Sequence, residues 1–205
     1  MIAGVDGTRG GWVVAVVDRG AVRWHLAADA DEVLRVTAAC TRVGVDIPIG
    51  LSETGYRSGD LAAREFLGAA RSSIFHAPVR AVLDAEDYAT ACETSTSVFG
   101  KAISKQTWFI VDKIREWDRL PRDERVIEVH PECSFKQMGV TAGKKTALGV
   151  VQRIEALRGF VDPVLHADLP PGPAIDDVLD ALAAAWTAQR SAEGGSFRLG
   201  AEIEV

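Results

Sequence analysis

Hydrophobic positions in the first fifty residues alternate with turn residues in a pattern that predicts three strands, one helix and a fourth strand. The expected strands cover residues 2–6, 12–17, 21–26 and 43–47, and the helix begins at Asp29 or Asp31 and ends near residue 39. The first three strands follow one another closely enough to pair as hairpins, whereas the helix allows the fourth to run parallel to a neighbour. We therefore expect a mixed sheet.

Helical periodicity dominates the middle of the chain, from about residue 58 to residue 120. The predicted helices there cover residues 60–70, 85–98 and 106–120. A fifth strand over residues 125–129 and a helix over 146–158 follow, and a last helix begins at Asp176 or Asp177, with a weak tail strand near 197–205. We find no repeat and no linker that would divide the chain, so we expect one domain, residues 1–205, with a helical insertion at about 58–120.

Composition and charge narrow the classes of protein. The 205 residues are 47% hydrophobic and 25% charged, which is typical of a globular domain with its own core. The formal net charge of −6 argues against a protein that coats nucleic acid through bulk electrostatics. No apolar run approaches the roughly 18 to 20 residues of a membrane span, so we expect no membrane partner and a cytoplasmic location.

Three acidic residues occur within or at the end of apolar strands. Asp6 ends the first strand in IAGVDGT, Asp46 lies in VGVDIPIG, and Glu128 lies in RVIEVHPE. A charge there is costly to bury unless it is paired, hydrogen-bonded or bound to metal. Each also has a plain structural explanation: a turn aspartate before glycine, a strand end exposed at Pro48, and an edge strand facing water.

The last helix begins with three aspartates and is otherwise apolar nearly all round, which predicts that it is buried against the sheet. Asp176, Asp177 and Asp180 are spaced so that their charges repel by roughly 0.2 to 0.5 kcal/mol per pair. No lysine or arginine within one turn downstream relieves them. A helix cap and the helix dipole explain one or two of these aspartates, but explain Asp180 less well.

Several oxygen ligands that converge from different elements are what a two-metal phosphoryl-transfer site requires. We therefore expect Asp6, Asp46, Asp177 and Asp180 to hold Mg²⁺ or Mn²⁺. Glu128 is then either a fifth ligand or the residue that orients water.

Basic residues elsewhere offer phosphate contacts for an acidic protein. Arg71, Arg80, Lys101 and Lys105 are interpreted as clamps for a polyanion, with ordinary solvated helix charges as the alternative. His130 is a candidate for substrate binding or proton transfer, or else a structural histidine at a strand end.

The segment GVTAGKKT superficially looks like a nucleotide-binding loop. It has three residues instead of four between its glycines and an extra lysine before Thr146, so we reject that interpretation.

The order of these acids resembles the ribonuclease H-like superfamily, which places an acid on the first strand, another on the fourth and one or two on a late helix. The segment DDVLDALAAA is similar to the D-x-x-D-A helix of the Holliday-junction resolvase branch. Nearly the whole chain resembles an uncharacterised bacterial family of predicted ribonuclease H-like nucleases, domain of unknown function 429. The matching segments are GVDGTRGGW, VGVDIPIGL, RSSIFHAPVRAVL, GKAISKQTW, KIREWD and IEVHPECSF.

This resemblance implies an α/β ribonuclease H-like fold: a mixed five-stranded sheet flanked by helices, with the helical insertion after the fourth strand. It also implies a metal-dependent nuclease, a hydrolase of phosphodiesters in structured nucleic acid. One alternative is an ATP-binding phosphotransferase-like protein of the actin and sugar-kinase type, because GVDGTRGG is similar to their first phosphate-binding turn. Such proteins need two domains of this kind, which a homodimer would supply. A non-catalytic binding protein is the third hypothesis.

Overall fold

The computed structural model describes residues 1–162 and 168–205 and shows an α/β protein with two compact units. The first unit combines Met1–Ile47, Arg122–Phe197 and Glu204–Val205. The second combines Pro48–Pro121 with Arg198–Ile203, and so contains the stretch for which the sequence predicts a helical insertion.

A mixed sheet with strand order β3-β2-β1-β4-β5-β7-β6 organises the fold. Strand β1 pairs with β2 in antiparallel and with β4 in parallel orientation, and β4 pairs with β5 in parallel orientation. The prediction of five strands is wrong: the described residues form seven, because the tail contributes two strands of two residues each. The strand bounds are β1 (Ile2–Thr8), β2 (Gly11–Asp18), β3 (Ala21–Ala27), β4 (Arg42–Val45), β5 (Val126–Val129), β6 (Arg198–Leu199) and β7 (Ile203–Glu204).

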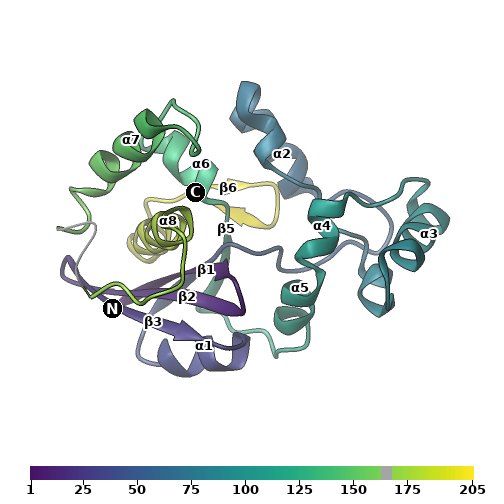
Figure 1. Ribbon diagram of the computed structural model, residues 1–205, viewed down its shortest axis with the longest axis horizontal. Coiled ribbons are helices and arrows are strands. Elements are labelled where there is room, and N and C mark those ends of the chain that lie inside the picture. Colours follow the sequence, from purple (N-terminus) through teal and green to yellow (C-terminus); the bar gives the residue numbers. More distant parts are fainter. Residues whose placement is uncertain (163–167) are drawn as a thin grey trace. The chain divides into compact units, whose positions relative to one another are not determined.

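Helices cover both faces of the sheet in the first unit. Helix α8 (Ile175–Glu193) packs against β1, β2 and β4, and α6 (Pro131–Gln137) and α7 (Ala147–Leu157) pack against α8. Helix α1 (Ala30–Val36) packs against β2 and β3 on the opposite face (Figure 1). The prediction that the last helix is buried is confirmed, since the side chains from Val178 to Ala185 are all buried.

Two glycines allow the backbone of α8 to lie directly on the sheet. A Cβ atom on Gly4 of β1 would lie 2.0 Å from the carbonyl oxygen of Ala181, and one on Gly44 of β4 would lie 2.4 Å from that of Ala184. Real Cβ atoms do not approach other atoms so closely, so any side chain at either position would push α8 away. Gly4 and Gly44 are direct neighbours in the β1–β4 register.

The helices of the second unit differ from the predicted ranges at their ends. Helix α2 ends earlier than predicted because Gly68 has φ of 60°, and α3 begins later because the side chain of Asp87 caps it. The predicted helix over 106–120 is two helices, since Ile110 leaves the helical conformation. The bounds are α2 (Ser58–Leu67), η1 (Gly68–Ser73), η2 (Arg80–Asp84), α3 (Tyr88–Phe99), α4 (Lys105–Phe109) and α5 (Val111–Asp118).

Within residues 1–162 and 168–205, no helix combines the length and the apolar character needed to cross a bilayer.

The variant Gly44→Ala tests the close approach of α8. Alanine should favour the strand over glycine, so a loss of stability would report the contact with the Ala184 carbonyl. We expect a loss of roughly 1–3 kcal/mol or more in the free energy of unfolding, measured by urea denaturation. The control is Gly159→Ala, whose Cβ would meet no atom within 4 Å. Equal stability of the two variants would contradict the contact.

Candidate metal centre

The same register that pairs the two glycines places two aspartates side by side. Side chains alternate between the faces of a strand, so Asp6 follows Gly4 and Asp46 follows Gly44 on the face that α8 covers. The ladder continues to this level, because the Asp46 N–H donates to the Val5 carbonyl at 2.9 Å.

Helix α8 supplies the third carboxylate. Asp180 directly precedes Ala181, whose carbonyl lies against Gly4. One carboxylate oxygen from each of Asp6, Asp46 and Asp180 lies within 4.8 Å of the others. We call these three residues the acid triad. The contact between α8 and the sheet thus determines where the triad forms.

Burial and mutual repulsion make the triad hold protons. Burial raises the pKa of Asp6 well above its ordinary value of 3.8, and the charges of Asp46 and Asp180 raise it further. Burial likewise raises the pKa of Asp46, and the charge of Asp180 adds to this effect. For Asp180, burial raises the pKa to about 6, although Lys144 lowers it. A cation among these groups would replace the protons.

Asp180 has one oxygen bound to the protein and one without a partner. Its Oδ2 accepts a hydrogen bond from the Lys144 ammonium group at 3.0 Å. Its Oδ1 is fully buried and accepts no hydrogen bond, while Asp180 as a whole is 4% exposed. A buried carboxylate oxygen without a donor is costly. This oxygen is therefore suited to a ligand that the protein itself does not supply.

The loop that carries Lys144 is fixed by helix α7. A Cβ on Gly149 would lie 2.1 Å from the Gly143 carbonyl oxygen, so only glycine allows the loop backbone to rest on the helix there. The buried Arg153 donates to the Ala142 carbonyl at 2.9 Å. Lys144 also lies 3.9 Å from Asp176. Burial alone would lower the pKa of Lys144, but the charge of Asp180 and their hydrogen bond raise it overall.

Asp177, which the sequence groups with the metal ligands, has a contact outside the triad. Its Oδ2 accepts a hydrogen bond from the Ala174 N–H at 3.1 Å at the start of α8. Its charge nevertheless contributes to the raised pKa of Asp6, after burial and the other two triad acids. Asp177 therefore lies near the triad, and its role as a ligand stays a prediction.

Glu128 is buried, but the alternation of side chains puts it on the face of the sheet opposite to α8. It is in register with Val45, whereas Gly44 faces α8 and Asp46 follows Gly44 in the alternation. Its charge is among the smaller contributions that raise the pKa of Asp46. His130 precedes α6 as its N-cap residue and is half-buried. The proposed roles of Glu128 and His130 in catalysis and substrate binding stay predictions.

The remaining candidate substrate-binding residues belong to the second unit. Arg80 forms ion pairs with Asp118 and Glu53 at 2.5 and 2.9 Å. The ammonium group of Lys101 lies 5.0 Å from the centre of the Tyr56 ring, and that of Lys105 lies 5.7 Å from the centre of the Tyr88 ring. Arg71 is exposed.

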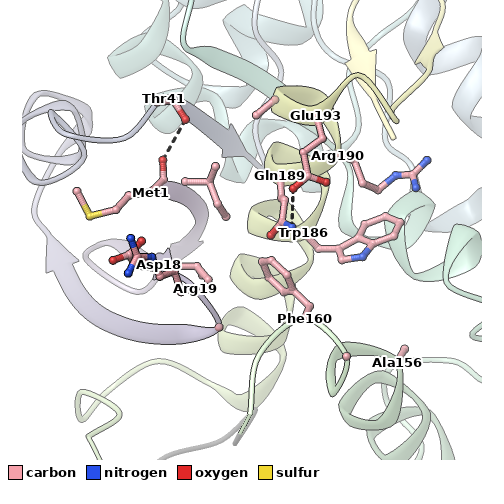
Figure 2. Close-up of a pocket in the computed structure, with 15 residues that line it drawn as sticks. Met1, Asp18, Arg19, Thr41, Ala156, Phe160, Trp186, Gln189, Arg190 and Glu193 are labelled. Carbon is pink, nitrogen blue, oxygen red and sulfur yellow. Dashed lines mark hydrogen bonds between the residues drawn. The ribbon is translucent and has the colours of Figure 1, made fainter.

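A cavity of about 670 Å³ lies elsewhere in the first unit (Figure 2). Phe160, Trp186 and Arg190 contribute to its wall, and the Arg190 guanidinium lies 4.7 Å from the centre of a Trp186 ring. This cavity borders the last turns of α8, whereas Asp180 lies near its start. No triad residue lines it.

Sequence reasoning missed Lys144. The aspartates of α8 have no basic residue in the following turn, and the relieving charge comes from 36 residues earlier. Lys144 belongs to the segment GVTAGKKT, whose sequence was compared above with nucleotide-binding loops. The glycines and the two adjacent lysines of this segment could have indicated a basic loop with a fixed backbone.

A protein-family model described as "Protein of unknown function (DUF429)" matches residues 4–204. The match includes all three triad residues and Lys144. No curated protein and no solved structure matches the chain.

The raised pKa of Asp180 predicts how stability depends on pH in the metal-free protein. Because the folded pKa is about 6 and the ordinary value is 3.8, the folded state binds more protons between these values. The contribution of Asp180 to the free energy of unfolding is fully present below about pH 4, and it is lost as the pH rises through 6. Asp180→Asn should therefore gain stability relative to the wild type over this range, by roughly 2–3 kcal/mol.

The measurement is thermal unfolding in EDTA between pH 4 and pH 8. The control is Asp31→Asn, which removes an exposed carboxylate from α1. Parallel pH profiles for the wild type and Asp180→Asn would contradict the prediction.

Proposed function

We propose that this chain, which belongs to the family of unknown function DUF429, is a divalent-metal-dependent nuclease with a ribonuclease H-like fold. The observation that carries the proposal is the meeting of Asp6, Asp46 and Asp180 within 4.8 Å, from two strands and one helix. Their spacing and burial suit one shared cation better than three separate structural roles.

The residues of the triad fit Mg²⁺ or Mn²⁺. Both ions prefer oxygen ligands, and each triad residue offers a carboxylate. The buried Oδ1 of Asp180 accepts no hydrogen bond, and a bound cation would satisfy this oxygen. Burial is the main cause of the raised pKa values of the three acids. Raised pKa values are expected of carboxylate ligands that bind protons in place of a cation.

Such a cation, when bound, supplies polarisation of a phosphoryl oxygen and activation of water. The chain's own residues define the rest of the site. The triad would hold the cation, and the ammonium group of Lys144 offers a positive charge beside Asp180. Taken by itself, the second unit carries Arg71, Lys101 and Lys105 as exposed cations, and exposed cations are suited to the phosphates of a polyanion.

The ribonuclease H-like assignment is supported by the strand arrangement and the origin of the acids. Strand β1 lies between antiparallel β2 and parallel β4, and acids come from β1, from the end of β4 and from the late helix α8. This is the order that the resemblance implies.

Metal binding is tested first, by thermal unfolding with MnCl₂ or MgCl₂. At about 100 times the dissociation constant, one bound ion should stabilise the wild type by about 2.7 kcal/mol, or roughly 5–10 °C. Asp6→Asn should abolish this response because it removes a ligand, whereas Asp31→Asn should retain it. An unchanged response of Asp6→Asn would contradict the assignment of the metal site.

Nuclease activity is tested on single-stranded, duplex and branched DNA and RNA with Mn²⁺ and with EDTA. We expect cleavage in the presence of Mn²⁺ and none in EDTA. In Asp6→Asn and Asp180→Asn, the cleavage rate should fall by at least about 100-fold, which equals about 2.7 kcal/mol of transition-state stabilisation. Thermal stabilisation by a non-hydrolysable ATP analogue, without cleavage of any nucleic acid, would instead favour the actin and sugar-kinase type of activity.

A further inference from the structure

We infer that Lys144 occupies the place of a second cation, so that the acid triad binds one divalent ion per chain and not two. This inference rests on the proposed function, because it concerns how the same site is charged.

The first argument is the use of the carboxylate oxygens. Asp6 Oδ1 accepts the Gly7 N–H at 2.7 Å, and Asp180 Oδ2 accepts the Lys144 ammonium at 3.0 Å. A pair of divalent ions about 4 Å apart needs ligands that reach both ions. If Asp180 were to reach two ions, its Oδ2 would have to serve the second one, and that oxygen already accepts the hydrogen bond from Lys144. Of the two Asp180 oxygens, only Oδ1 is left for a cation.

Charge balance gives the second argument. The three ionised triad residues carry three negative charges; Lys144 neutralises one of them and one divalent ion neutralises the other two. A second divalent ion beside Asp180 would be repelled by the ammonium group at close range, where the Coulomb energy is several kcal/mol even at an effective dielectric constant of about 20.

Contacts between its loop and α7 fix the position of Lys144. Its loop is tied to α7 by Gly149, Arg153 and the side chain of Gln152, which accepts the N–H groups of Thr141 and Ala142 at 3.1 and 2.9 Å. The Lys144 side chain is 36% exposed, against 5% for that of Asp180, so a partly exposed lysine reaches a buried carboxylate. An ordinary surface lysine would not have its backbone fixed in this way.

The test counts Mn²⁺ ions bound per chain, by calorimetry and by the electron paramagnetic resonance signal of free Mn²⁺, on metal-stripped full-length protein. We expect one ion in the wild type and two in Lys144→Met, because removal of the ammonium frees Asp180 Oδ2. Lys145→Met is the matched control, since Lys145 is the exposed neighbour of Lys144, and it should bind one ion. Lys144→Arg keeps the charge and should also bind one. Lys144→Gln replaces Lys144→Met if the latter does not fold.

The outcomes separate this inference from the proposed function. Two ions in the wild type, or one in both Lys144→Met and Lys144→Gln, would overturn the role of Lys144 and leave the metal-dependent nuclease intact. No Mn²⁺ bound by the wild type would overturn both.

Discussion

The contact between the backbone of α8 and the centre of the sheet is the constraint on which the rest of the first unit depends. It exists because Gly4 and Gly44 carry no side chains where the carbonyls of α8 lie. The contact buries an alanine-rich helix face and also forces Asp180 towards Asp6 and Asp46. Close packing that stabilises the core therefore creates electrostatic repulsion at its edge. Protons and Lys144 offset that repulsion when no metal ion is present.

Much of this site could be predicted from the sequence, for physical reasons. An aspartate at the end of an apolar strand has a known face once the strand pattern is known, and a helix that is apolar nearly all round must lie against the sheet. These two facts bring Asp6, Asp46 and Asp180 together. The sequence could not separate Asp177 from Asp180, because helical spacing puts both on one side. Asp177 reaches back to the free Ala174 N–H only because it lies in the first turn.

The features that the sequence did not reveal depend on contacts between distant segments. Lys144 meets Asp180 because Gly149 lets a loop rest on α7, and no local pattern reports such an approach. Helix α6 was missed because it follows almost directly on β5, so that no loop separates the strand pattern from the helix pattern. In the second unit, Ile110 interrupts an otherwise helical stretch, and hydropathy alone carries no sign of that backbone change. The tail strands are too short to stand out from loop residues.

The order of the triad along the chain has a consequence for biosynthesis. Asp6 and Asp46 leave the ribosome before Asp180 and before the helix that covers both glycines. A nascent chain therefore carries two of the three carboxylates on an uncovered sheet until α8 emerges. Any product that stops before α8, through early termination or proteolysis, lacks the third carboxylate together with the helix that covers the sheet. Assembly of the acid triad therefore has to wait for the synthesis of α8.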